Sequence, residues 1–308
     1  MNILLVDDHA VVRQGYTSLL AMMLGQAEVI VAGGQENMSL APMALPKARW
    51  GHRMELTGVG DVLDFMVFDG LWEIFYGYHM GVTAEAIAAM YAIGRQEQDE
   101  LGVLSHTRAR SAIIEGLFAQ EITPVTIQTR KGETVFDTDE RPMDTNMEKM
   151  GKLRPAFKKD GTVTAGNASG INDGAAALVL AEASYAEKQG LSPMARLVSY
   201  AFAGVDPAYM GEGPIPAVTK ALERAGLKVG DMDVIESNEA FAAQAIAVSR
   251  GLGLDMEKTN PNGGAIALGH PLGASGARIL TSLINVMEHR DGARGLATMC
   301  IGTGQGIA

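Results

Sequence analysis

The chain has 308 residues, of which 47% are hydrophobic and 20% are charged. This composition excludes an intrinsically disordered chain, and the length allows a large core and about two domains. The formal net charge of −11 argues against nucleic acid and anionic membranes as partners, because both would repel an acidic surface.

The first elements form a strand, a helix and a second strand. Residues 3–6 are a short apolar run, and residues 9–24 carry apolar side chains at helical spacing. Residues 27–34 predict a second strand that ends in a turn at Gly33 and Gly34. This order predicts a β–α–β unit, which is usually right-handed and parallel.

The middle of the chain, residues 39–170, lacks a sustained strand pattern. It predicts helices over 81–98 and 101–121, a strand over 122–128 and a charged loop over 131–144. We interpret this region as an insertion that covers a sheet domain.

The last part of the chain alternates strands and helices. Residues 172–181 are small and apolar, which predicts a fully buried strand. Further strands are predicted over 196–199, 234–236 and 295–300, and helices over 215–225, 239–252 and 275–289, with Gly226 ending the first helix. The alternation predicts a layered α/β fold.

The cysteine and apolar content bear on where the chain works. Its one cysteine, Cys300, excludes an intrachain disulfide and suits a reducing cytoplasm, so we expect a cytoplasmic protein. No apolar run is long enough to span a bilayer, and residues 1–6 lack the basic start of a signal peptide. We therefore expect no membrane partner.

Three segments near the carboxyl end, 238–241, 263–276 and 300–306, place reactive side chains beside small residues. His270 lies among glycines that let a ligand approach the backbone, where an imidazole can act as a base or donate to an oxyanion. Read alone, His270 is a turn histidine, Asn238 is a helix N-cap, and Cys300 is a small buried hydrophobe. The three segments together favour a catalytic site.

The order, spacing and glycine context of these segments resemble the thiolases, which make and break carbon–carbon bonds in acyl-CoA thioesters. The resemblance implies a thiolase-like α/β fold of helix and sheet layers, with the amino-terminal half-domain incomplete. It implies that His270 activates the nucleophile and forms an oxyanion hole with a water held by Asn238. It also implies that Cys300 is the acid/base thiol, which needs a lowered pKa, and that the Gly302 N–H lines a second oxyanion hole. The family has glycine where this chain has Thr303.

Two upstream segments, 76–81 and 164–170, extend the resemblance to the substrate. It implies that the pantetheine and thioester end meets His79, Met80, Ala165, Ala168, Ser169, Ala240 and Phe241. The alternative for both segments is a packed loop and a buried turn. The resemblance further implies acetyl-CoA or acetoacetyl-CoA as substrate in fatty acid metabolism, no cofactor beyond the CoA thioester, and a homo-oligomer whose tetramer-forming loop is 51–61.

One feature of the family is missing. The cysteine that a thiolase acylates should fall near Asp8, and the chain has no cysteine before Cys300. Residues 1–15 instead resemble the start of a response-regulator receiver domain, in which an acidic pair such as Asp7 and Asp8 binds Mg²⁺. A receiver also needs an aspartate and a lysine on later strands, so we assign no receiver function to this pair.

These observations divide the chain into four parts. Residues 1–22 form a receiver-like strand–helix graft, and 23–40 with 171–192 form the remnant of a thiolase amino-terminal domain. Residues 41–170 form a covering loop domain, and 193–308 form the carboxy-terminal domain. The sequence predicts an acetyl-CoA C-acetyltransferase with impaired turnover. The alternatives are a non-catalytic CoA-binding remnant or chimeric gene product and, as the last alternative, a receiver-type signalling protein.

Overall fold

The structure, a computed structural model, describes residues 27–51 and 61–308. The predicted strand 3–6 and helix 9–24, the pair Asp7 and Asp8, and most of the loop 51–61 lie outside the described residues. Among the residues that are described, no helix is long and apolar enough to cross a membrane.

A four-stranded sheet forms the centre of the carboxy-terminal half, in the order β10–β11–β12–β9. β10 (Val234–Ser237) runs parallel to β11 (Gly295–Ile301), whereas β11 pairs antiparallel with β12 (Gln305–Ile307) and β12 with β9 (Phe202–Gly204). All four residues of β10 are buried because helices cover both faces of this sheet.

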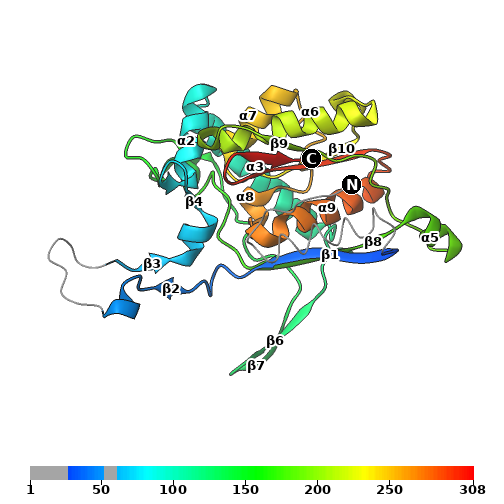
Figure 1. The fold of residues 1–308 in the computed structure, drawn as a ribbon, viewed down its shortest axis with the longest axis horizontal. Helices are drawn as coiled ribbons and strands as arrows, with labels where there is room; N and C mark the ends of the chain where they lie inside the picture. Colours follow the sequence, from blue (N-terminus) through cyan, green and yellow to red (C-terminus); the bar gives the residue numbers. More distant parts are fainter. Residues whose placement is uncertain (1–26, 52–60) are drawn as a thin grey trace.

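Helices and sheets alternate in layers (Figure 1). α6 (Pro214–Ala225) and α7 (Ala242–Leu252) lie on one side of the central sheet, and α9 (Leu272–His289) lies on the other. α6 begins with a proline in its first turn and ends at Gly226, whose φ of 67° suits a residue without a side chain. The predicted helices of this half and the predicted strands 234–236 and 295–300 are confirmed, with ends shifted by up to three residues.

A second, two-stranded sheet packs against the opposite side of α9. β1 (Val29–Glu36) pairs antiparallel with β8 (Gly174–Ala181) from Val29 and Ala181 to Glu36 and Gly174. The predicted turn at the glycines is wrong, because β1 continues through them. A Cβ on Gly34 would lie 1.8 Å from the backbone oxygen of Gly273, so glycine allows α9 to touch the strand directly.

The prediction that 172–181 is a fully buried strand is also wrong. Side chains along β8 alternate between exposed and half-buried, and Val31 on β1 and Val179 on β8 are each 71% exposed. The reason is that α9 covers only one face of this sheet. Residues 196–199 form no strand, and Leu197 and Val198 are more than 60% exposed.

The middle region supplies helices that pack on the carboxy-terminal half. The predicted helix 81–98 is two helices, because α2 (Met80–Met90) stops before Ala92, whose φ is 50°, and α3 (Arg95–Ile114) begins afterwards. β6 (Val125–Thr129) and β7 (Gly132–Phe136) form a hairpin that is exposed at every position and projects from the body (Figure 1). β7 therefore occupies part of the predicted loop 131–144.

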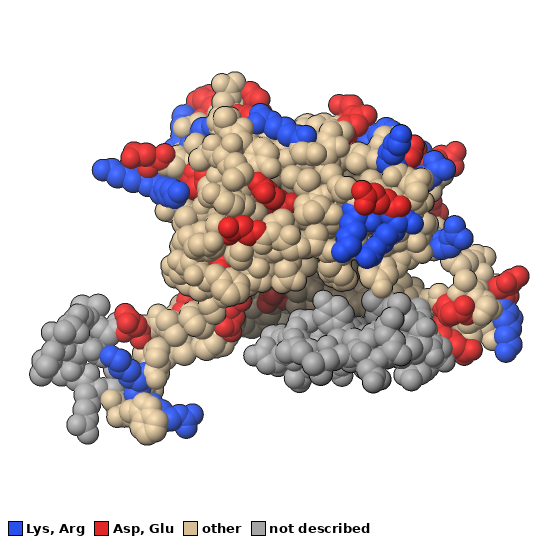
Figure 2. All heavy atoms as spheres, turned by 45° about the horizontal axis from the view of Figure 1, so that its top comes forward, with Lys and Arg blue, Asp and Glu red and all other residues tan. Residues whose placement is uncertain are grey.

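Short elements complete the described chain. They are β2 (Met43–Ala44), η1 (Ala48–Trp50), β3 (Leu63–Asp64), η2 (Met66–Gly70), β4 (Trp72–Glu73), β5 (Tyr78–His79), α4 (Met147–Gly151), α5 (Ala183–Lys188), η3 (Pro207–Glu212), η4 (Val229–Asp231) and α8 (Ala265–Leu268). On the face shown in Figure 2, basic side chains lie among acidic ones rather than in a separate patch.

Candidate active site

Asn238 and His270 lie side by side although 32 residues separate them. Asn238 follows β10, and His270 lies between α8 and α9. The distance between Asn238 Nδ2 and His270 Nε2 is 3.3 Å, and both residues are buried. The N-cap of α7 is Phe241, so Asn238 does not cap that helix and its amide is available to the imidazole.

The hydrogen bonds on the other side of the ring determine its tautomer. Ser275 Oγ lies 2.5 Å from His270 Nδ1 and donates its one hydrogen to the Pro271 carbonyl oxygen at 2.9 Å. The hydroxyl can therefore only accept from the ring, so we assign the proton to Nδ1 and the lone pair to Nε2. The Asn238 amide N–H donates to that lone pair.

The protonation state of His270 follows from its burial. Burial, with a smaller contribution from the charge of Arg278, lowers the pKa of His270 to about 4. The imidazole is therefore neutral at pH 7, and Nε2 can accept a proton from a group that replaces the Asn238 N–H.

Cys300 lies near the end of β11 and is only 3% exposed. It belongs to a hydrophobic cluster with Met80, Ala84, Val163, Ala168, Met210, Ala240 and Phe241, and Phe157 packs against the cluster. Burial raises the pKa of the Cys300 thiol to about 12, which is opposite to the lowering that a base requires. In this state the group is a neutral S–H that can give a proton but cannot take one.

Gly302 and Thr303 form the turn that follows β11. A Cβ on Gly302 would lie 3.1 Å from Met80 Cε, so this backbone approaches the same cluster. Thr303 has a φ of 65°, in the left-handed region that favours glycine, and Gly304 follows with a φ of 84°. The turn thus keeps a glycine-like conformation despite the threonine.

Four of the residues expected at the substrate surround the thiol. Met80, Ala168, Ala240 and Phe241 belong to the Cys300 cluster, and Ala168 forms a β-bridge with Phe241. Ser169 N donates to the Ala240 carbonyl oxygen at 3.0 Å, which joins the segment 164–170 to the segment after Asn238. The upstream and downstream motifs therefore meet in one region.

His79 lies at the edge of this cluster. Its ring stacks on Phe157 with centroids 4.7 Å apart, and Phe157 meets Phe241 edge to face at 6.1 Å. His79 Nδ1 also accepts from Gly81 N, so the side chain caps α2. Ala165, by contrast, is exposed in its turn and makes no contribution to the cluster.

Sequence reasoning missed two residues that hold the site together. Arg141 Nε donates to the Ile266 carbonyl oxygen at 3.2 Å, and Arg141 Nη2 donates to Ala168 O at 3.5 Å, so one guanidinium joins the segments of His270 and Ala168. Ser275, which orients the ring, lies five residues after His270 within the segment already identified. Its spacing was a usable signal, whereas the contacts of Arg141 required the fold.

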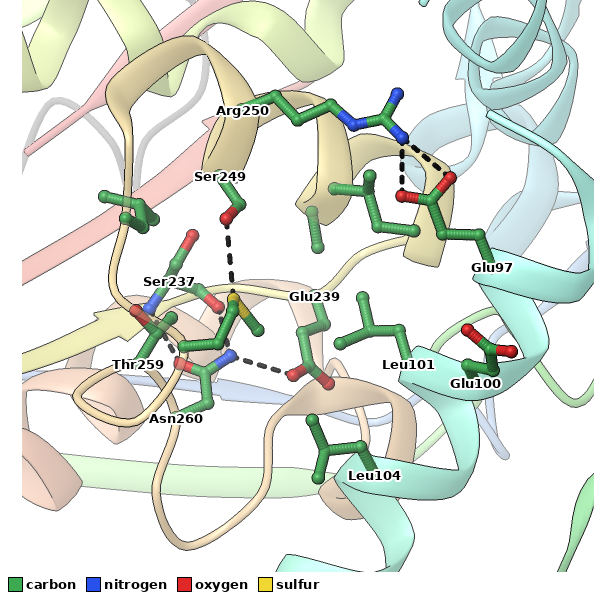
Figure 3. A pocket seen from close by; sticks show the side chains of 14 residues that line it. Glu97, Glu100, Leu101, Leu104, Ser237, Glu239, Ser249, Arg250, Thr259 and Asn260 are labelled. Atoms are coloured by element: carbon green, nitrogen blue, oxygen red, sulfur yellow. Dashed lines mark hydrogen bonds and ion pairs between the residues drawn. The ribbon is translucent and has the colours of Figure 1, made fainter. Parts of the chain in front are cut away.

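A cavity of about 270 Å³ lies between α3 and α7 (Figure 3). Its lining includes Ser237, Glu239 and Asn260 but neither His270 nor Cys300. The cavity is therefore separate from the cluster around the thiol, and no residue belongs to both. Among the described residues, no three His, Cys, Asp or Glu side chains are grouped so that they could hold a metal ion.

Comparison with protein families gives two adjoining matches. Residues 16–184 match the thiolase N-terminal domain, and residues 191–308 match the thiolase C-terminal domain. The first match begins at residue 16, so residues 1–15 lie outside it.

Curated proteins and solved structures agree with these matches. The chain is 58% identical to an acetyl-CoA acetyltransferase of Syntrophomonas wolfei over 286 residues, 92% of this chain and 72% of that protein. It is 59% identical to an acetyl-CoA acetyltransferase of Escherichia coli K12 over 290 residues, 94% of this chain and 73% of that protein. The crystal structure of the Bacillus anthracis acetyl-CoA acetyltransferase superposes with a TM-score of 0.91 at 47% identity, covering 96% of this chain and 74% of that one. A human mitochondrial 3-ketoacyl-CoA thiolase in complex with CoA superposes with a TM-score of 0.88 at 42% identity. The superposition covers 95% of this chain and 74% of the human one.

Proposed function

Because this chain belongs to the thiolase family, we propose that its site binds acetyl-CoA or acetoacetyl-CoA and that it descends from acetyl-CoA C-acetyltransferases. The observation that carries this proposal is the contact between Asn238 and His270 beside the cluster that contains Cys300. Seven curated proteins named acetyl-CoA acetyltransferase are 52–59% identical to this chain, which supports the same class of substrate.

Each polar group has a role in the proposed chemistry. His270 Nε2 is the base, because the ring is neutral and its lone pair faces the site. The Asn238 amide and the Gly302 N–H supply donors for the two thioester oxygens. The Cys300 thiol protonates the leaving carbon or sulfur and becomes a thiolate, and this thiolate needs stabilisation by the bound substrate, because burial alone opposes it.

The pantetheine arm would enter along the segments that meet at the thiol. Met80, Ala168, Ala240 and Phe241 provide apolar contact, His79 and Ser169 provide polar atoms, and Ala165 lies at the exposed end. Small side chains leave room for the arm, and the packed rings of Phe157 and Phe241 favour a short acyl group. The CoA thioester is the substrate, and the proposed chemistry uses no prosthetic group.

The chain has no cysteine at the position where the resemblance expects the nucleophile. Cys300 is its one cysteine, and the position near Asp8 where the resemblance expects the acylated thiol carries no cysteine and lies outside the described residues. A carboxylate is a poorer nucleophile than a thiolate and would form an anhydride instead of a thioester. We therefore propose that acyl transfer through an acyl-enzyme is abolished or nearly so. This feature favours a second candidate, a CoA-binding protein without turnover.

Two measurements test the proposal together. Calorimetric titration with acetyl-CoA should show binding to the intact chain, and steady-state thiolysis of acetoacetyl-CoA should show little or no turnover. Absence of acetyl-CoA binding would contradict the proposed site. Ordinary turnover that is lost in Cys300→Ala would contradict the proposed impairment while supporting the acyltransferase assignment.

Self-association is part of the same proposal. Leu40, Met43 and Trp50 are 70–81% exposed, and such apolar side chains close together in the sequence suit contact with a second copy of the chain. Light scattering should give a mass above that of the 32.5 kDa monomer.

A further inference from the structure

We propose that Glu239 is a positioning residue that holds Asn238 at hydrogen-bond distance from His270. This inference rests on the proposed function only for the identity of the ligand, acetyl-CoA. The contact between Asn238 and His270 can be measured without any ligand. Glu239 directly follows Asn238 in the chain, and its side chain reaches the segment that leads to His270.

The Glu239 carboxylate is buried and receives three hydrogen bonds. Oε2 accepts from Ser105 Oγ at 2.7 Å and from Ile266 N at 3.2 Å, and Oε1 accepts from Asn260 Nδ2 at 2.8 Å. The three donors come from α3, α8 and the loop before α8. One carboxylate therefore ties together three segments that are distant in the sequence.

Asn260 extends this network to the other side of Asn238. Its Oδ1 accepts from Ser237 N and its Nδ2 donates to Ser237 O, both at 2.8 Å. Figure 3 shows Ser237, Glu239 and Asn260 together, with the Asn260 amide between the other two. Asn238 N also donates to Thr298 O at 2.9 Å, so the backbone of Ser237 and Asn238 and the side chain of Glu239 are all held.

The connection to His270 runs through α8. Ile266 N, bound by Glu239, lies in the first turn of α8 (Ala265–Leu268), and His270 follows two residues after this helix ends. Ser105 Oγ also accepts from Gly264 N at 3.1 Å, which holds the start of α8 by a second bond. A Cβ on Gly264 would lie 2.2 Å from Glu239 Cδ, so the carboxylate packs directly on this backbone.

Glutamine cannot reproduce this pattern. A side-chain NH₂ in place of Oε1 would face the Asn260 amide N–H, and an NH₂ in place of Oε2 would face the Ile266 N–H. Either orientation sets two donors against each other, so one of the two segments must move. Burial raises the pKa of Glu239, and the hydrogen bonds that its oxygens accept from Ser105, Asn260 and Ile266 N oppose this rise because they favour the carboxylate.

The test uses Glu239→Gln and a matched control, Glu121→Gln. Glu121 is another largely buried carboxylate that accepts from a serine hydroxyl and an asparagine amide, Ser282 Oγ and Asn285 Nδ2, each at 3.2 Å. Both of its partners lie on the second half of α9, beyond Ser275. Each variant thus replaces one carboxylate oxygen that accepts hydrogen bonds, Glu239→Gln beside Asn238 and Glu121→Gln beside α9.

The readout is the ¹⁵N chemical shift of His270 Nε2, with Asn238→Ala defining the value without the amide donor. We expect Glu239→Gln to move this resonance toward the Asn238→Ala value and Glu121→Gln to leave it at the wild-type value. Acetyl-CoA affinity should fall about tenfold in Glu239→Gln, as for the loss of one hydrogen bond to a buried group, and less than about twofold in the control.

If Glu239→Gln does not fold, the ¹⁵N shift of His270 Nε2 can be measured in Ser105→Ala instead. It removes one donor and leaves the carboxylate, and we expect the same direction of the Nε2 shift with a smaller size. An unchanged Nε2 resonance in the folded Glu239→Gln or Ser105→Ala protein, or an equal shift in Glu121→Gln, overturns the proposal. Wild-type protein that fails to bind acetyl-CoA contradicts the proposed function alone, because the Nε2 comparison still reports the Asn238–His270 contact.

Discussion

The two sheets on either side of α9 differ in how completely they are covered. The four-stranded sheet has helices on both faces, and Val234 and Ile235 on β10 are fully buried. The β1–β8 sheet has α9 on one face only, and Val31 and Val179 lie open on the other. Asn238 directly follows β10 and Cys300 lies in β11 of the covered sheet, so these groups of the site are held by the part of the molecule with the more complete core.

This comparison also bears on the proposed impairment of the site. In the resemblance, the amide, imidazole and second thiol come from the carboxy-terminal half, while the acylated thiol comes from the amino-terminal end. The half that is densely packed in this chain retains its reactive side chains. The end that should carry the nucleophile carries no cysteine.

The largest expected effect compares the two sheets directly. Ile235→Ala removes a fully buried side chain from the cluster with Val218, Leu222 and Leu254, and we expect it to lower the free energy of unfolding by about 2–5 kcal/mol. Val31→Ala, on the open face, should change it by less than about 0.5 kcal/mol. Urea denaturation measures both, and equal losses would show that the open face is covered in solution.

A smaller effect concerns the carboxyl groups around α9. Burial raises the pKa of Glu121 to about 7, so the folded state holds a proton between pH 4.5 and 7 that the unfolded state has released. Stability from this group is present below pH 4.5 and is lost as the pH rises toward and beyond 7, by on the order of 2 kcal/mol. Glu236, with a pKa raised to about 8, extends the loss to higher pH.

Replacing Glu121 should flatten this dependence. We expect Glu121→Gln to lose less stability than wild type between pH 5 and 8, measured by urea denaturation at several pH values. Identical slopes for the two proteins would contradict the assignment of the titration to Glu121.

Ser275→Ala should affect the imidazole more than the fold. Removing the hydroxyl leaves the buried His270 Nδ1–H without its acceptor, at a cost of about 1–3 kcal/mol. We expect the imidazole ¹⁵N spectrum to show a changed proportion of the two tautomers, whereas Ser282→Ala, in the same helix, should leave it unchanged. A preserved tautomer in Ser275→Ala would mean that another group orients the ring.

The smallest effect is expected at the turn after β11. Thr303→Gly relieves a β-branched residue at a φ of 65°, and we expect a gain of about 1 kcal/mol in the free energy of unfolding. Gly302→Ala should instead lower the free energy of unfolding, because its Cβ would press on Met80. A loss of stability in Thr303→Gly would show that the threonine contacts outweigh the backbone strain.

The sequence predicted the carboxy-terminal half well because its signals are local. Buried apolar runs indicated β10 and β11, Gly226 marked the end of α6, and the glycine-rich context identified His270. The expected thiolase-like layered fold is confirmed by the superposition at a TM-score of 0.91. The roles of Asn238, His270, Cys300 and Gly302 remain proposals, as do the four parts into which we divided the chain.

The errors arose where the outcome depends on a distant neighbour. The apolar run 172–181 looks like a buried strand, but whether it is covered depends on what packs on its second face. Arg141 stands in a charged loop and still reaches the segments of His270 and Ala168, and Phe157 joins His79 to Phe241. Periodicity carries no information about such contacts.

The direct backbone contact between Gly34 and Gly273 couples the open sheet to the imidazole. Gly273 lies three residues after His270, and a Cβ on Gly174, at the paired end of β8, would meet Pro271 at 2.7 Å. Because no side chain separates strand from helix here, a side chain added at either glycine would displace the segment that carries His270.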